Sequence, residues 1–173
     1  ELVDWRRFPV REMAARGYFV HLPANPKHDP EATIRAFIAP FQKKLVYALH
    51  KKTLRSGRAM DKYALAAWTI RVVYRAQQVP LEGKFKHESL ALEGMREIAQ
   101  LSWSTRGPLL AQELLAKHGI PLVIEPHLPH TRLDGAALLV DEQRPVVGMT
   151  LRYDRLDNFW FCLMHELAHV HLH

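Results

Sequence analysis

The chain has 173 residues, which is enough for one well-packed domain, or for one domain with an appendage. Hydrophobic residues make up 48% and charged residues 24%, as in ordinary soluble globular proteins, and this excludes a disordered or low-complexity chain. The net charge of +6 is spread unevenly, because residues 1–118 hold 20 Lys/Arg against 11 Asp/Glu, and residues 119–173 hold 4 against 7.

The cysteine content and the hydropathy suggest a compartment. The single cysteine, Cys162, excludes an intrachain disulfide, so we expect a reducing cytoplasm. Its apolar neighbours favour a small core residue over a nucleophile. There is no signal-peptide pattern, and the most apolar stretch, 159–164, is too short to span a membrane. The chain starts at Glu1 instead of Met, so we expect a fragment or a processed product, and we expect the chain to be truncated at its other end as well.

The first two thirds of the chain have the pattern of helices. Apolar side chains recur at helical spacing, and typical residues mark helix ends, such as Asp29 as an N-cap, Pro30 at a first helical position and Gly119 as a stop. Pro40 ends or kinks one helix. The segments for which we expect a helix are 8–17, 29–39, 41–54, 59–79, 87–103 and 107–119.

The densest basic stretch runs from Lys43 to Lys62 and holds seven Lys/Arg against Asp61 alone. Such a patch can meet nucleic acid or an acidic protein. A solvated helix face is the more ordinary interpretation. The stretch has no regular interleaving of aromatic residues and no known nucleic-acid motif that would favour the first.

From residue 120 onward the pattern changes to strands. Residues 120–126 form a short apolar run between prolines, and residues 134–151 hold two strands joined by a turn at 141–145. A last helix over 157–173 follows, with Asp154 or Asp157 as its cap. The order predicts an α+β fold, in which a helical region over 1–118 precedes a small, mainly antiparallel three-stranded sheet and one helix over 119–173.

That last helix contains an H-E-x-x-H motif, formed by His165, Glu166 and His169. Residues four apart in a helix point the same way, so two imidazoles at this spacing can bind one zinc ion. Glu166 lies about 100° round the helix from His165, where the carboxylate of zinc proteases takes a proton from the bound water. The motif therefore predicts His165 and His169 as metal ligands and Glu166 as the catalytic base.

The apolar residues around the motif predict that the helix is buried on all sides, which favours paired or metal-bound histidines over free ones. A buried His–Glu network without metal is the alternative. His171 points away from the pair, and His173 is too far along the helix to join it. His127 and His130 can fold back toward the site, but histidines in such a position more commonly lie in a loop without a role in the site.

A catalytic zinc has three protein ligands, and this chain supplies two. The third comes either from beyond residue 173 or from an upstream residue that the sequence does not identify. We therefore expect weak zinc binding by the isolated chain.

The stretch LDGAALLVDEQRPVVGMTLRYDRLDNFWFCLMHELAHVHLH, residues 133–173, resembles the ImmA/IrrE family of bacterial and phage metallopeptidase domains. The segment WRRFPVREMAARGYF and the helices after it are similar to the linker and helical part of fusions with a helix-turn-helix domain. The resemblance implies a zincin-like core, with His165 and His169 as zinc ligands, Glu166 as general base and an acidic third ligand on a later helix.

The resemblance also implies a function, namely a zinc-dependent endopeptidase domain of a transcriptional regulator that cleaves a repressor-type protein. The alternative is a non-catalytic sensory or interaction module of a DNA-binding, antitoxin-like repressor. In either case the expected partner is a repressor or toxin. DNA is contacted only through a domain that is not in this chain, and no membrane is involved. A homodimer is one option for the oligomeric state, which the sequence leaves open.

Overall fold

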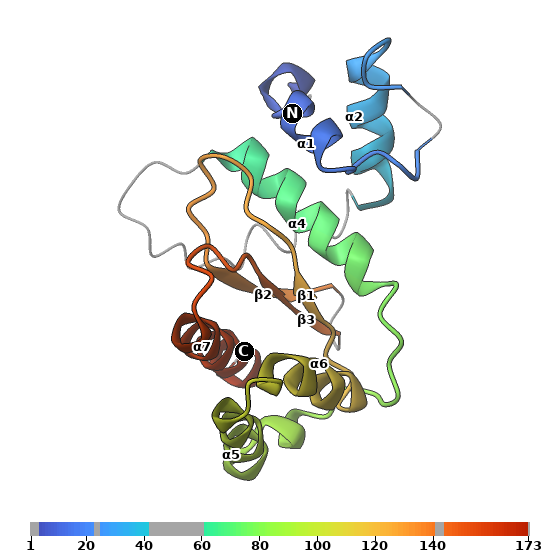
Figure 1. Ribbon diagram of the computed structural model, residues 1–173. Coiled ribbons are helices and arrows are strands. Elements are labelled where there is room, and N and C mark those ends of the chain that lie inside the picture. Colours follow the sequence, from blue (N-terminus) through green and yellow to red (C-terminus); the bar gives the residue numbers. More distant parts are fainter. Residues whose placement is uncertain (1–3, 23–24, 42–60, 141–143, 173) are drawn as a thin grey trace. The chain divides into compact units, whose positions relative to one another are not determined.

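The computed structural model of the protein describes residues 4–22, 25–41, 61–140 and 144–172. In these ranges it has six α-helices, four short 3-10 helices and a three-stranded sheet, which confirms the α+β class (Figure 1). No helix in these ranges is both long enough and apolar enough to cross a membrane.

Contacts divide the chain into two compact units. Unit 1 holds Glu1–Arg71 and Leu128–Arg132, and unit 2 holds Val72–His127 and Leu133–His173. The boundary between the units falls inside a helix, between Arg71 and Val72, and the last helices before the sheet belong to the same unit as the sheet.

Unit 1 begins with η1 (Trp5–Arg7), α1 (Val10–Ala15), α2 (Pro30–Ile38) and η2 (Ala39–Phe41). The predicted start of α2 is confirmed, because the Asp29 carboxylate accepts the Ala32 N–H at 2.9 Å and Pro30 stands at the first position. Aromatic rings fill the core, where Phe37 lies 6.1 Å from Tyr18 and 5.7 Å from Phe19 between ring centroids. The helix expected over 41–54, and most of the basic stretch, lie outside the described residues.

Helix α4 (Lys62–Ala76) is capped by Asp61, whose Oδ1 accepts the N–H groups of Tyr63 and Ala64 at 2.8 and 3.2 Å. The end of α4, from Val72 onward, belongs to unit 2. There the Arg75 guanidinium donates to the carbonyl of Ile124 at 2.6 Å and pairs at 2.8 Å with Glu125, whose side chain is buried. These contacts tie the helix to the end of the first strand.

The sheet consists of β1 (Leu122–Ile124), β2 (Gly135–Leu139) and β3 (Pro145–Met149), in the order β1-β3-β2. β2 and β3 form an antiparallel pair with Ala137 opposite Val147, and β1 pairs with β3 in parallel with Val123 opposite Gly148. The three-stranded sheet is therefore mixed, with one antiparallel and one parallel pair, where the sequence predicted a mainly antiparallel sheet. The second strand of the hairpin enters the sheet between β1 and β2, and it runs in the same direction as β1.

The remaining elements of unit 2 are η3 (His87–Leu90), α5 (Leu92–Gln100), η4 (Leu101–Trp103), α6 (Gly107–Lys117) and α7 (Leu156–Leu172). The single helix predicted over 87–103 is divided, because Ala91 is extended with a ψ of 176°. The predicted stop after α6 is confirmed by Gly119, whose φ of +76° favours glycine.

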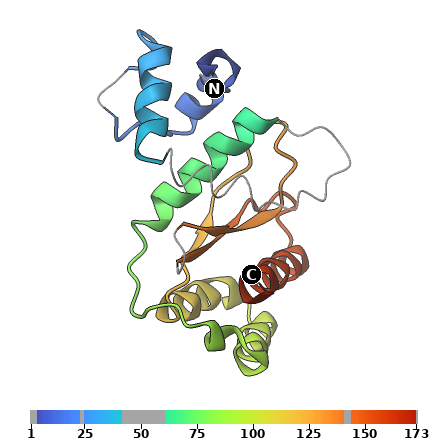
Figure 2. The same ribbon diagram turned by 180° about the vertical axis from the view of Figure 1, so that it is seen from behind.

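Helices α6 and α7 lie on the same side of the sheet, as both views show (Figures 1 and 2). α7 contacts β2 and β3, α6 contacts β1, and α5 contacts α7. The core between them is apolar, and its most buried members, each at 0% exposure, are Ala111, Leu115, Ile120, Val147, Leu163 and Leu167. This packing fixes one face of α7 and leaves another face for the candidate site.

Candidate functional site

Helix α7 carries the H-E-x-x-H motif and has two different faces. Leu163 and Leu167 are fully buried against the core. On another face, Phe161 and Leu172 are 74% and 71% exposed, and His165 is exposed as well. The prediction that α7 is buried on all sides is therefore wrong. The apolar residues on the exposed face have no covering element among the described residues.

The two histidines of the motif lie together on this exposed face. Their Nε2 atoms are 3.2 Å apart, and the ring planes are nearly perpendicular at 85°. The Phe161 ring stacks along the His165 ring, with a centroid distance of 6.4 Å and an interplanar angle of 16°. Because Phe161 is one turn before His165, it restricts the directions that this imidazole can take.

The spacing of the two nitrogens fits a zinc ion. In a tetrahedral site with Zn–N bonds of about 2.0–2.1 Å, two ligand nitrogens lie about 3.3–3.4 Å apart. The Nε2 atoms of His165 and His169 are close to this separation at 3.2 Å. No group of three or more His, Cys, Asp or Glu that could hold a metal occurs among the residues that the structure describes. The two histidines that the motif predicts as ligands therefore lie side by side, and no third such group lies with them in those ranges.

The third member of the motif, Glu166, turns toward the sheet. Its Oε2 accepts the backbone N–H of Ala137 in β2 at 2.7 Å. β2 is an outer strand of the sheet, and alternate residues of an outer antiparallel strand direct their N–H groups away from the neighbouring strand. The carboxylate therefore occupies a donor that the sheet itself leaves free. This contact joins residues 29 positions apart in the chain and is not foreseeable from the motif.

Gly135 makes room for this carboxylate. A Cβ at this position would lie 3.2 Å from Glu166 Cγ and 3.2 Å from the Gly148 carbonyl oxygen. Such contacts are tighter than ordinary van der Waals separation. A side chain at Gly135 would therefore press on the Glu166 side chain, which is also the more flexible of the two neighbours.

The other histidines of the sequence do not join the pair. His171 lies against His87 of η3, with ring centroids 4.8 Å apart and a tilt of 30°. This confirms that His171 points away from His165 and His169. His127 and His130 form no metal-binding group with them in the described ranges. His173 lies outside those ranges.

Cys162 is buried on α7, near the start of β2. Burial raises the pKa of the Cys162 thiol, and the negative charges of Asp134 and Glu166 add to the shift. A raised pKa keeps the thiol protonated and unreactive near neutral pH. Cys162 therefore behaves as the small core residue that the sequence predicts.

Asp134 is a charged neighbour of this region that the sequence did not single out. Its Oδ1 is buried without a hydrogen bond from any described residue, and it forms an ion pair with the Arg152 guanidinium at 3.8 Å. No sequence motif marks this residue, because its nearness to Glu166 arises only when β2 packs beside α7.

Comparisons of the chain with models of protein families, with curated proteins and with solved structures gave no match.

Proposed function

We propose that this chain is a zinc-dependent endopeptidase domain of a bacterial or phage transcriptional regulator, and that it hydrolyses a peptide bond in a repressor-type protein. The observation that carries the proposal is the 3.2 Å separation of the His165 and His169 Nε2 atoms, with Glu166 beside them on α7. The regulator and its repressor substrate rest on the resemblance of residues 133–173 to the ImmA/IrrE family. The reaction type rests on the histidines and the glutamate.

In this proposal His165 and His169 hold zinc through Nε2, and a third protein ligand completes the set. When bound, zinc supplies a Lewis acid for the scissile carbonyl and lowers the pKa of water. Glu166 accepts a proton as water attacks the carbonyl carbon, and it passes that proton to the amine nitrogen as the C–N bond breaks.

The contact of Glu166 with β2 supports this role, because it fixes one oxygen of the carboxylate. Oε2 is held by the Ala137 N–H at 2.7 Å, whereas Oε1 makes no hydrogen bond with any described residue. Oε1 is therefore the atom that takes the proton.

Metal binding is the first test. Zinc is titrated into the full chain in competition with a coloured chelator, and we expect weak binding that mild chelation reverses, because two histidines make a poor site. His165→Ala and His169→Ala should each abolish it. His171→Ala is the matched control on the opposite side of α7 and should leave it unchanged. Equal loss in all three variants would contradict the assignment of the ligands.

Hydrolysis is the second test. A library of fluorescence-quenched peptides is incubated with zinc-loaded protein, and Glu166→Gln is expected to keep the metal but lose cleavage. Cleavage by this variant at the rate of the unchanged protein would show that Glu166 is not the base. Zinc retained in stoichiometric amount through dialysis would show that a third ligand lies in this chain or in a neighbouring copy.

A non-catalytic interaction module is the second candidate. It is favoured by the exposed Phe161 and Leu172 beside the histidines, because exposed apolar side chains of this size often mark a binding face. The two functions differ in the result of the cleavage assay. A module would cleave no peptide even as the unchanged protein, and Glu166→Gln would leave its binding to the partner as it is.

A further inference from the structure

The positive charge of the chain is concentrated in unit 1. Unit 1 holds 15 Lys/Arg against 6 Asp/Glu, and unit 2 holds 9 against 12. Their net charges, +9 and −3, add to the +6 of the whole chain. The division of the charge thus follows the structural boundary inside α4, and the attraction for a polyanion belongs to unit 1.

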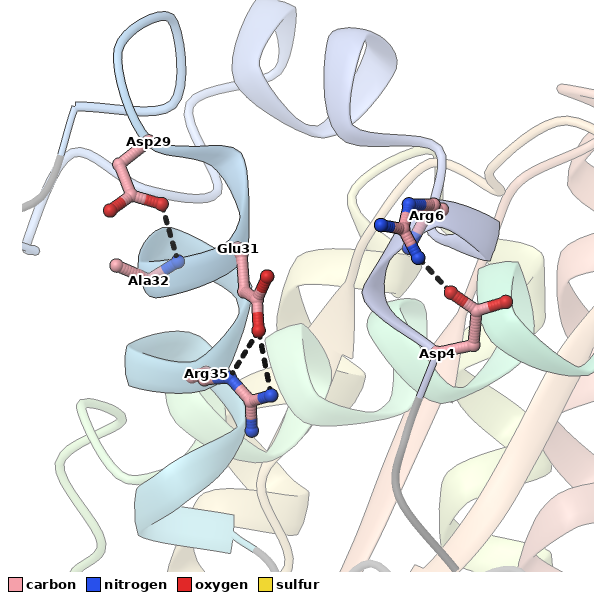
Figure 3. A network of polar contacts seen from close by, with 6 residues as sticks. All are labelled: Asp4, Arg6, Asp29, Glu31, Ala32 and Arg35. Carbon is pink, nitrogen blue, oxygen red and sulfur yellow. Dashed lines mark hydrogen bonds and ion pairs between the residues drawn. The ribbon is translucent and has the colours of Figure 1, made fainter.

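Three carboxylates of unit 1 are engaged as helix N-caps. Asp4 accepts the N–H of Arg6 at 3.2 Å at the start of η1, and Asp29 accepts that of Ala32 at 2.9 Å at the start of α2 (Figure 3). Asp61 caps α4 in the same way. These three groups neutralise backbone donors at helix ends and are not paired with the side chain of any arginine or lysine that the structure describes.

The other two described carboxylates of unit 1 pair within their own helices. Glu12 binds Arg16 at 2.6 Å, and Glu31 binds Arg35 at 2.7 Å, the second of which is drawn in Figure 3. Within the described ranges, the exposed cations of unit 1 that have no carboxylate partner are therefore Arg6, Arg7, Arg11, Lys27, Lys62 and Arg132.

Three of these cations lie on aromatic rings, in a group that we call the cation–aromatic cluster: Trp5, Arg6, Arg7, Lys62 and Tyr63. The Arg6 guanidinium lies 5.2 Å from the Trp5 ring centroid. Arg7 and Lys62 lie 4.6 and 5.4 Å from the Tyr63 ring centroid. The cluster joins η1 to the start of α4, so residues far apart in the sequence supply the aromatic interleaving that the basic stretch alone lacks.

The cluster has the chemistry of a phosphate-binding surface. A guanidinium that stacks on an aromatic ring keeps its N–H fork free for phosphate oxygens. Phe8 is buried and packs edge-on to Tyr63 at 5.2 Å, which holds that ring in place. Both rings of the cluster are half-buried beneath cations, and such rings are not placed to insert into a lipid bilayer.

We propose that unit 1 binds nucleic acid through the phosphate backbone at the cation–aromatic cluster, without reading base sequence. The proposal differs from the expectation that DNA is contacted only through a domain outside this chain. It does not depend on the zinc site, because every residue of the cluster belongs to unit 1.

The test measures binding of the full chain to a fluorescent DNA duplex of mixed sequence, by anisotropy, between about 50 and 200 mM salt. The variant R6A/R7A/K62A is expected to bind roughly 10-fold or more weakly at the lower salt concentration. The slope of log affinity against log salt concentration should become less steep by about 3, since each lost phosphate contact reduces the steepness by about 1. A duplex of unrelated sequence should give the same values.

The matched control is K84A/K86A/K117A, which removes three exposed lysines from unit 2. It should bind like the unchanged protein, and so should Glu166→Gln. If R6A/R7A/K62A no longer unfolds cooperatively, then R6Q/R7Q/K62Q, which keeps the aliphatic contact with the rings, replaces it. No DNA binding at about 50 mM salt, or equal losses in the two triple variants, overturns the proposal. Binding to phosphatidylserine vesicles but not to DNA overturns it in favour of a membrane surface.

Discussion

Replacing Gly135 with alanine is expected to loosen the hold of β2 on the Glu166 carboxylate. The new Cβ would stand 3.2 Å from Glu166 Cγ and 3.6 Å from Glu166 Oε1. The nearby Gly148 carbonyl belongs to β3, the middle strand, and cannot retreat easily. The glutamate side chain must therefore move, and its 2.7 Å bond to the Ala137 N–H must lengthen.

The size of the effect follows from two opposing contributions. A hydrogen bond to a charged group contributes about 1.5–3 kcal/mol, and we take the lower end because Ala137 is only half-buried. Gly135 has no positive φ, so alanine fits the backbone and gains about 0.4–1 kcal/mol from the unfolded state. We therefore expect Gly135→Ala to lower the free energy of unfolding by about 0.5–1 kcal/mol.

A double-mutant cycle isolates the contact. In a Glu166→Ala background there is no Cγ to displace, so Gly135→Ala should be neutral or slightly stabilising. The contact with the Gly148 oxygen is present in both backgrounds and cancels. Urea denaturation followed by circular dichroism should then give a coupling energy of about 1–2 kcal/mol. A coupling energy near zero would refute the conclusion that the absence of a side chain at Gly135 makes room for the Glu166 carboxylate.

Leu167→Ala is expected to lower the free energy of unfolding, measured by urea denaturation, by about 3 kcal/mol, because the Leu167 side chain is fully buried. Leu172→Ala, on the exposed face of the same helix, should change that free energy by no more than about 0.5 kcal/mol. Asp29→Ala should lower the free energy of unfolding by about 1 kcal/mol through loss of the α2 cap, and Glu31→Ala should lower it by less than about 0.5 kcal/mol. High salt should widen this difference, because it screens the ion pair of Glu31 with Arg35. Because the folded state raises the pKa of the Cys162 thiol, stability should decline as pH rises past the unfolded thiol pKa of about 8.5, and a Cys162→Ala variant should lack this decline. If the pH dependence of stability is unchanged in the Cys162→Ala variant, the decline does not arise from the Cys162 thiol.

The helix termini were predictable because their signals are local. Asp29 and Pro30 mark the start of α2, and Gly119 marks the end of α6, through interactions within one turn of chain. Helical geometry likewise placed His171 away from His165. The break at Ala91 was not predictable, since the apolar spacing continues through it.

The arrangement of the sheet and the exposure of α7 were not predictable, because both depend on which segments meet. Hairpin signals identify β2 and β3 as neighbours but do not place β3 beside β1. Hydrophobicity marked Phe161 and Leu172 as core residues, yet it carries no information on whether a covering element is present. For the same reason, the motif identified Glu166 but not the Ala137 amide that holds it.

The carboxylate on the edge of β2 also affects how copies of the protein meet. An outer strand with a free N–H is a template for the outer strand of another copy, and a buried or half-buried charge at that place opposes such association. Glu166→Ala would leave the Ala137 N–H open on a short apolar strand, whereas Glu166→Gln keeps an acceptor there. Of two variants that both lack the proposed base, the alanine form should therefore self-associate more readily at high concentration.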